Sequence, residues 1–178
     1  VKAGKSYAMI ITNNSGLWRY NIGDVVTFTS VNPYKIVISG RTKHFLNLCG
    51  EELMVGNADA AITGAAEACG VHVLNYTATV VPPTDHEKAR HQWLIEFKEP
   101  PSDPVRFQKT LDKLLCDQNS DYESKRNKNV ALEIPEVVIA RQNLFMDWLV
   151  KHGKTGGQQK IPRLQQKRDI MDDLLSMN

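Results

Sequence analysis

Cysteine is scarce in this sequence, and it is not arranged for disulfides or metals. Only Cys49, Cys69 and Cys116 occur, and no two of them form a Cys-x-x-Cys pair. An odd, scattered set predicts no disulfide framework and favours a reducing, cytosolic environment. His86 and His91 lie five residues apart with no cysteine near them, so the sequence predicts no zinc site and we expect no bound metal in this chain.

Long apolar runs and an excess of one charge are also missing. The longest apolar runs, such as residues 8–11 and 137–140, are far too short to cross a bilayer, and no charged-then-apolar leader is present. A net charge of +2 at pH 7 gives no electrostatic basis for binding nucleic acid or a membrane. The sequence has no Gly-x4-Gly-Lys-Ser/Thr loop and no Gly-x-Ser-x-Gly, which excludes a P-loop and a serine-hydrolase elbow. We therefore expect a cytoplasmic protein with neither a nucleic-acid partner nor a membrane partner.

What is present suits an ordinary globular chain. Hydrophobic residues make up 42% and charged residues 24% of 178 residues, which fits one domain, or one domain plus part of another. The chain begins at Val1 rather than Met, and we expect it to be a piece of a longer protein.

The first forty residues read as β structure only. Turn-forming residues at 13–16 and at Asn32-Pro33 separate short runs rich in β-formers. Strands are predicted over residues 6–12, 17–22, 24–30 and 34–39.

From Gly40 onward, the pattern alternates between helical and strand periodicity. A short hairpin is predicted across Gly50, and residues 84–91 and 154–160 read as loops. Strands are predicted over residues 71–81, 92–98 and 135–141. Helices are predicted over residues 58–69 (capped by Asn57 and closed by Gly70), from Asp103-Pro104 onward, and over residues 120–127, 143–152 and 165–176. Tyr122, Lys125 and Arg126 are expected on a solvated helix face. The predicted fold class is α+β, with a small mixed sheet flanked by helices.

Four charged residues are candidates for chemistry. Gly23 precedes Asp24, and a carboxylate that follows a glycine can approach and bind the vicinal diol of a ribose; taken alone, however, Asp24 fits a hairpin turn better. Arg41 can offer a fork of donors to phosphate or ribose oxygens, or form a surface salt bridge. Lys43 lies where the all-β part ends, and alone it fits a solvated charge. Lys160 lies in a Gly/Gln-rich loop that could bring its ammonium group to a phosphate, although such loops are more often simply exposed.

Taken together, these motifs resemble the C-terminal signature of adenylate-forming enzymes. Tyr20-Asn21-Ile22-Gly23-Asp24 resembles the Tyr-x-x-Gly-Asp motif that holds the AMP ribose, and residues 40–50 resemble the hinge motif. Lys160-Ile161-Pro162-Arg163 resembles the final Gly-Lys-x-x-Arg motif, with Gln159 in place of its glycine.

Within that superfamily, the chain is most similar to the auxin-responsive-promoter (Gretchen Hagen) family of acyl-acid amido synthetases, particularly its bacterial members. The segments that carry this likeness are residues 15–26, 50–53, 119–126 and 158–164. The likeness covers essentially the whole chain, but the chain corresponds only to the last part of the family's length.

The resemblance implies a division of the chain and a reaction. Residues 1–39 would be the β-stranded tail of a large N-terminal adenylation domain, from its β-barrel subdomain. Residues 40–178 would be a mobile C-terminal lid domain with its hinge near Lys43. The whole enzyme would be a ligase that converts a small carboxylic acid and ATP to an acyl-adenylate and then forms an amide with an amino acid or another amine.

The resemblance also implies roles for single residues. Tyr20, Gly23, Asp24 and Arg41 would bind the nucleotide, and Lys160 would be catalytic. ATP and Mg²⁺ would be bound mainly by the missing N-terminal part, so the isolated chain is predicted to be inactive.

Two other functions remain open from the sequence. One is the lid of a thioester-forming acyl-CoA ligase, which differs only in the nucleophile. The other is a non-catalytic binding module with the same fold. An enzyme fragment should leave apolar surface of its first strands uncovered, whereas an independent module should cover it.

Overall fold

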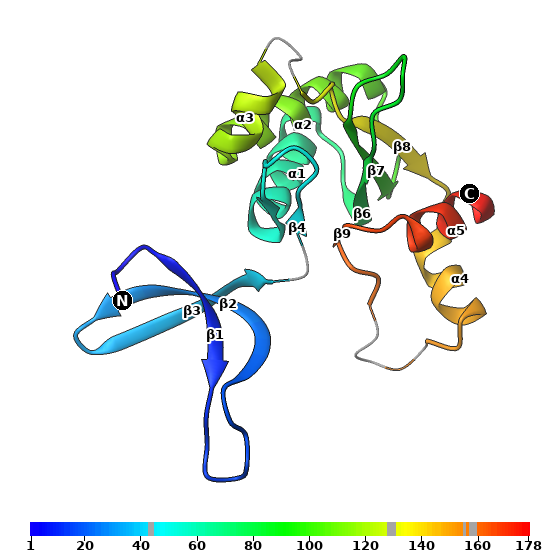
Figure 1. The fold of residues 1–178 in the computed structure, drawn as a ribbon. Helices are drawn as coiled ribbons and strands as arrows, with labels where there is room; N and C mark the ends of the chain where they lie inside the picture. Colours follow the sequence, from blue (N-terminus) through cyan, green and yellow to red (C-terminus); the bar gives the residue numbers. More distant parts are fainter. Residues whose placement is uncertain (43–44, 128–130, 155, 157–159) are drawn as a thin grey trace.

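The computed structural model describes residues 1–42, 45–127, 131–154, 156 and 160–178. Figure 1 shows two parts, a small β-sheet near the N-terminus and a larger unit in which helices surround a second sheet. The predicted hinge residue Lys43 lies outside the described residues, and so does most of the predicted loop over residues 154–160.

The N-terminal sheet is an antiparallel meander in the order β1 (Ser6–Ile11), β2 (Tyr20–Val31), β3 (Tyr34–Arg41). The prediction of two separate strands over residues 17–22 and 24–30 was wrong, because β2 runs unbroken through Gly23. Gly23 has φ +84°, and the register with β1 shifts over the same stretch, since Ala8 pairs with Val25 but Ile10 pairs with Asn21. A glycine absorbs such an irregularity without ending the strand.

This sheet carries many large apolar side chains that no described residue covers. Trp18 is 78% exposed, Tyr34 is 72% exposed and Ile38 is 69% exposed. Other exposed apolar residues of the same sheet and its turns are Ile10, Tyr20, Ile22, Val31, Ile36 and Val37. An apolar surface of this extent is typical of a buried interface rather than of a free surface.

The larger unit begins with a short hairpin of β4 (Phe45–Leu46) and β5 (Leu53–Met54), followed directly by helix α1 (Val55–Cys69). The helix starts three residues earlier than predicted, with Met54 as its N-cap. Asn57 acts inside the first turn instead, where its Oδ1 accepts a hydrogen bond from the Met54 N–H at 3.0 Å. Gly70 ends the helix in a left-handed conformation, as predicted.

The second sheet has four strands in the order β8 (Glu136–Ala140), β7 (Arg90–Phe97), β6 (Val73–Val81), β9 (Leu164–Gln165). The central pair β6 and β7 is antiparallel, while the two outer strands run parallel to their neighbours. Strand β7 begins at Arg90, within the stretch predicted as a loop, because residues 90 and 91 pair with the end of β6. The final helix, predicted from residue 165, begins later because Gln165 belongs to β9.

Helices cover both faces of this sheet (Figure 1). On one face lie α1, α2 (Pro104–Gln118) and α3 (Ser120–Arg126); on the other lie α4 (Leu144–Lys151) and α5 (Asp169–Met177). Successive side chains of β7 point to opposite faces of the sheet. Trp93 therefore packs in the core beneath α1, α2 and α3, and Leu94 packs in the core beneath α4 and α5. This confirms the α+β class with a mixed sheet flanked by helices.

The expected solvated face of α3 was wrong for Tyr122 and Arg126. The Tyr122 hydroxyl is buried and donates to Asp112 Oδ1 at 2.9 Å. Arg126 forms a forked ion pair with the same carboxylate, with Nε–Oδ1 at 2.7 Å and Nη2–Oδ2 at 2.6 Å. Polar residues on a short helix therefore join α3 to α2 instead of facing water.

No helix in the described part of the chain is long and apolar enough to span a membrane.

Candidate functional site

Two of the predicted nucleotide-binding residues, Asp24 and Arg41, lie side by side in the structure. They occupy paired positions on the neighbouring strands β2 and β3, and Arg41 Nε lies 3.1 Å from Asp24 Oδ1. The Asp24 side chain is mostly buried, at 13% exposed, whereas that of Arg41 is 62% exposed. The pair therefore presents a fixed carboxylate with a cation beside it, a pattern suited to hydroxyl and phosphate groups.

The backbone around Gly23 fixes the place of Asp24. The Gly23 N–H donates to Asn21 Oδ1 at 2.9 Å, and the Gly23 carbonyl accepts from the Thr42 N–H at 2.8 Å. With φ at +84°, this position disfavours any residue with a β-carbon. Asp24 is thus held directly beside Thr42, the last described residue before position 43.

The fourth predicted nucleotide-binding residue, Tyr20, lies at the other end of this stretch. It opens strand β2, pairs with Ile11 of β1 and is half exposed. Tyr20, Gly23, Asp24 and Arg41 thus all belong to the N-terminal sheet.

Lys160 lies in the larger unit, just ahead of a segment that the sheet holds firmly. The Thr77 hydroxyl donates to the Pro162 carbonyl at 2.7 Å, and the Ala78 N–H donates to the Arg163 carbonyl at 2.8 Å. Strand β9 then pairs with β6. The position of the Lys160 backbone is therefore set from its C-terminal side by contacts with β6.

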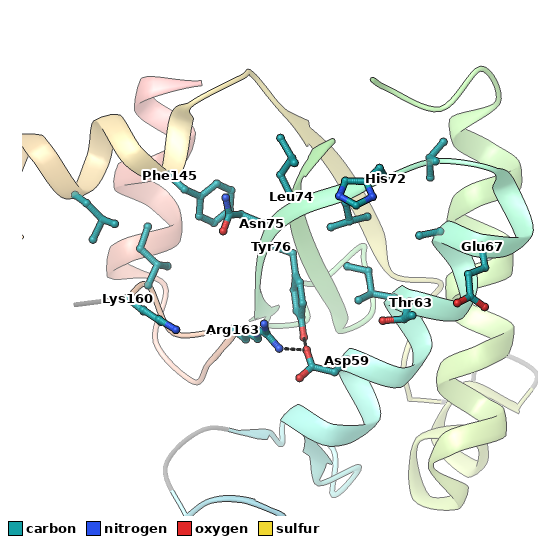
Figure 2. A pocket seen from close by; sticks show the side chains of 16 residues that line it. Asp59, Thr63, Glu67, His72, Leu74, Asn75, Tyr76, Phe145, Lys160 and Arg163 are labelled. Carbon is teal, nitrogen blue, oxygen red and sulfur yellow. Dashed lines mark hydrogen bonds and ion pairs between the residues drawn. The ribbon is translucent and has the colours of Figure 1, made fainter. Parts of the chain in front are cut away.

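Lys160 lines a cavity of about 770 Å³ between α1, β6, α4 and the segment that precedes β9. Figure 2 shows Lys160 and Arg163 entering this pocket from one side, with Asp59 and Tyr76 facing them. Apolar side chains form much of the remaining wall; they include Ile62, Val71, Val73, Leu74, Phe145 and Ile161. Lys160 is exposed, and among the described residues it has no ion-pair partner.

A charged cluster that sequence reasoning missed lies beside Lys160. Arg163 Nη1 forms an ion pair with Asp59 Oδ1 of α1, and the Tyr76 hydroxyl donates to the same oxygen at 2.6 Å. The Arg163 guanidinium also lies over the Tyr76 ring, 5.5 Å from its centroid. Burial and then the hydrogen bond to Asp59 raise the pKa of Tyr76 far above its usual value, so the hydroxyl remains a donor.

The structure does not bring Lys160 together with the Asp24–Arg41 pair. The pocket around Lys160 includes none of the four predicted nucleotide-binding residues, which all belong to the N-terminal sheet. Chemistry that needs both groups at one ligand therefore requires a change in the arrangement of the two parts. Within the described ranges, no group of three or more His, Cys, Asp or Glu is placed to hold a metal ion.

A second missed feature is a buried carboxylate–histidine pair directly after residues 40–50. Glu51 and His91 are both 0% exposed, and His91 Nε2 lies 2.9 Å from Glu51 Oε1. The Glu51 carboxylate also accepts from the Leu48 N–H at 2.8 Å and the Cys49 N–H at 2.7 Å. Burial alone raises the pKa of Glu51, but the hydrogen bonds from His91 and from the backbone outweigh it and lower that pKa to about 2.

Comparison with known proteins gives matches over nearly the whole chain. The GH3 family C-terminal domain matches residues 56–169, and the GH3 family central domain matches residues 1–41.

Among curated proteins, the chain is 25% identical to indole-3-acetic acid-amido synthetase GH3.3 of Arabidopsis thaliana, over 97% of this chain and 31% of that protein. It is 24% identical to the GH3.4 enzyme of the same plant, over 96% of this chain and 30% of that protein. The chain thus spans about a third of the length of the curated relatives it matches.

Solved structures show the same fold. The GH3.15 acyl acid amido synthetase superposes with a TM-score of 0.79 at 19% identity, covering all of this chain and 34% of that one. A structure of AtGH3.15 in complex with 2,4-DB gives a TM-score of 0.73 at 20% identity, again over all of this chain and 33% of that one.

Proposed function

Because this chain belongs to the GH3 family, we propose that it is the C-terminal part of an ATP-dependent acyl-acid amido synthetase. In the first step, a carboxylate oxygen of the acid attacks the α-phosphorus of ATP, and pyrophosphate leaves. In the second step, an amine nitrogen, normally that of an amino acid, attacks the acyl carbon of the adenylate, and AMP leaves. The names of the curated relatives support an amide product rather than a thioester.

The observation that carries the proposal is that the family likeness spans both parts of the chain, each of which holds one element of an adenylation site. The Asp24–Arg41 pair lies in the part that matches the central domain, and Lys160 lies in the part that matches the C-terminal domain. We assign residues 1–39 to the end of a large N-terminal adenylation domain and residues 40–178 to a lid domain.

The N-terminal sheet would bind the nucleotide in this scheme. The Asp24 carboxylate is fixed and mostly buried, and it would accept hydrogen bonds from the ribose hydroxyls. Arg41 is exposed enough to turn toward the ribose or the α-phosphate. Gly23 would let the backbone approach the ligand. Tyr20, at the start of the same strand, would also bind the nucleotide. ATP and Mg²⁺ would otherwise be bound by protein that precedes this chain.

The lid domain would supply the charge that stabilises adenylation. The Lys160 ammonium group would lie between the acyl carboxylate and the α-phosphate as negative charge develops there. Since Lys160 lies in a different part from Asp24, the lid must turn against the sheet, and we place the pivot near Lys43. The same turn would remove Lys160 before the amine attacks.

The uncovered apolar side chains of the N-terminal sheet support a larger protein. Trp18, Tyr34 and Ile38 are each more than two-thirds exposed. Leaving such a surface in water is unfavourable, and we propose that it packs against the preceding part of the enzyme. The scattered cysteines fit a cytoplasmic location, which we also propose.

The test is ATP–pyrophosphate exchange by the full-length protein with a panel of carboxylic acids, with the amide product detected by mass spectrometry. We expect exchange with at least one acid, and amide formation when amino acids are added. Lys160→Ala should lower exchange by about a hundred- to a thousandfold, because one preorganised charge at the reacting phosphate is lost. Lys167→Ala, at another exposed lysine shortly after it, is the matched control and should leave exchange unchanged.

The 178 residues alone should show no exchange, since they lack most of the nucleotide site. Turnover by this chain alone would contradict the division of the enzyme proposed here. Normal exchange by Lys160→Ala would remove Lys160 from the mechanism.

A further inference from the structure

We infer that Asp59 and Tyr76 are positioning residues for Lys160 and that they act on it through Arg163. The inference rests on the proposed function, because it gives Lys160 its role in adenylation. Asp59, Tyr76 and Arg163 are called the clamp below. All of them line the same pocket as Lys160 (Figure 2).

The chain between Lys160 and Arg163 is short and stiff. Only Ile161 and Pro162 separate the two residues. The proline ring fixes its own φ, and it also restricts the residue before it to extended conformations. A displacement of Arg163 is therefore passed on to Lys160 instead of being absorbed in between.

Arg163 is held by its side chain as well as by its backbone. Its backbone carbonyl accepts from the Ala78 N–H at 2.8 Å, which fixes the backbone of Arg163 but not the direction of its guanidinium. The ion pair with Asp59 and the stacking on Tyr76 fix that direction. The Tyr76 hydroxyl, 2.6 Å from the same Asp59 oxygen, in turn holds the carboxylate in place.

The Asp59 carboxylate thus has two donors, the Tyr76 hydroxyl from β6 and the Arg163 guanidinium from the segment before β9. Both residues line the pocket. Tyr76 is itself stacked on Trp93 of β7, with ring centroids 5.6 Å apart. The clamp therefore extends from the central sheet, through the pocket wall, to the segment that carries Lys160.

The energetic contribution of the clamp to folding should be small. The side chains of Asp59 and Arg163 are 38% and 54% exposed, and exposed ion pairs contribute little to stability. The pairing of β9 with β6 is formed by backbone groups, so we expect it to remain when the ion pair is removed. A rate effect without a stability effect is therefore expected, because catalysis is sensitive to misplacement of about 1 Å, which can cost on the order of a hundredfold.

The experiment compares the two half-reactions in the full-length protein. The variants are Asp59→Ala, its conservative counterpart Asp59→Glu, and Tyr76→Phe. The control is Asp172→Ala, which removes another Asp–Arg pair, that of Asp172 on α5 with the partly buried Arg168 at the N-cap of this helix; neither residue lines the pocket. Adenylation is followed by pyrophosphate exchange, and amide formation by reacting preformed acyl-adenylate with the amino acid.

We expect Asp59→Ala to lower the maximal rate of exchange by about ten- to a hundredfold and to leave the reaction of preformed acyl-adenylate unchanged. Tyr76→Phe should give a smaller loss in the same direction. Asp59→Glu keeps the carboxylate and should recover part of the loss. In a Lys160→Ala background, Asp59→Ala should have no further effect, because the residue through which it acts is already gone.

Three outcomes would overturn the inference while leaving the proposed function intact. The first is exchange by Asp59→Ala equal to that of the Asp172→Ala control. The second is an equal loss in both half-reactions, which indicates a structural role only. The third is a full additional loss in the Lys160→Ala background. If the wild-type protein gives no exchange with any acid, the proposed function itself fails, and the inference fails with it.

Discussion

Protonation of one buried carboxylate should control the acid stability of the larger unit, residues 45–178. Glu51 accepts hydrogen bonds from His91 and from two backbone N–H groups, and its pKa is lowered from 4.5 to about 2. At 1.36 kcal/mol for each pKa unit, the ionised form contributes roughly 3 kcal/mol to folding. Because the folded pKa lies below the unfolded one, this contribution is complete above about pH 4.5 and is lost as the pH falls toward 2.

Glu51→Gln imitates the protonated side chain at every pH, so it isolates this contribution. At pH 7 we expect the variant to be about 3 kcal/mol less stable than wild type, with the difference shrinking steadily between pH 4.5 and 2. Urea unfolding followed by tryptophan fluorescence measures this directly, because Trp93 and Trp148 are buried, at 0% and 3% exposed. Trp18, which is already 78% exposed, should contribute little to the signal change.

The matched control is Glu52→Gln, at the exposed neighbouring position, which should unfold like wild type at both ends of the pH range. The reasoning is refuted if Glu51→Gln is as stable as the control at pH 7. It is refuted equally if the loss at pH 7 persists undiminished near pH 2.

Three further variants test other parts of the structure. In the full-length enzyme, Asp24→Asn should raise the KM for ATP roughly tenfold through a weaker hold on the ribose, and an unchanged KM in the exchange assay would exclude that contact. Asp112→Ala should lower stability by roughly 3 kcal/mol, because the mostly buried guanidinium of Arg126 loses its forked partner and the buried Tyr122 hydroxyl loses its acceptor; a melting temperature like that of wild type would show that the pair is dispensable. Gly70→Ala should cost only about 1 kcal/mol, since φ is +66° but the space beside the α-carbon is open; a loss several times larger in the same thermal scan would point to a hidden steric conflict.

The elements that the sequence predicted well are those with local signals. Asp103 caps α2 by accepting from the Arg106 N–H at 2.9 Å, with Pro104 at the first helical position. Gly70 ends α1 in the left-handed conformation that glycine adopts without penalty. In each case the residue that defines the helix end lies within a few positions of the backbone groups with which it forms hydrogen bonds.

The strand boundaries that were wrong at β7 and β9 depend on pairing with another strand. Gln165 became part of β9 because β6, more than eighty residues earlier, offers it a parallel neighbour. Arg90 and His91 joined β7 through pairing with the end of β6. A short strand has no periodicity of its own to reveal such pairing.

The residues of the candidate site fall into the same two groups, those with a local signal in the sequence and those that depend on a partner elsewhere in the chain. Motif order and spacing were enough to single out Asp24, Arg41 and Lys160, and the structure places the first two in contact. Asp59 gave no chemical signal in the sequence, because its importance comes from an ion pair with Arg163, more than a hundred residues later. Glu51 and His91 are forty residues apart and become partners only when β7 brings His91 to the loop between β4 and β5.

The most direct test of the account is a structure of the full-length enzyme with a non-hydrolysable acyl-adenylate analogue. We predict that the Lys160 ammonium group lies within hydrogen-bonding distance, about 3 Å, of the group that replaces the α-phosphate, while the Asp24 carboxylate accepts from the ribose hydroxyls of the same ligand. A ligand-bound structure in which Lys160 stays remote from the nucleotide, or in which another residue binds the ribose, would contradict the account.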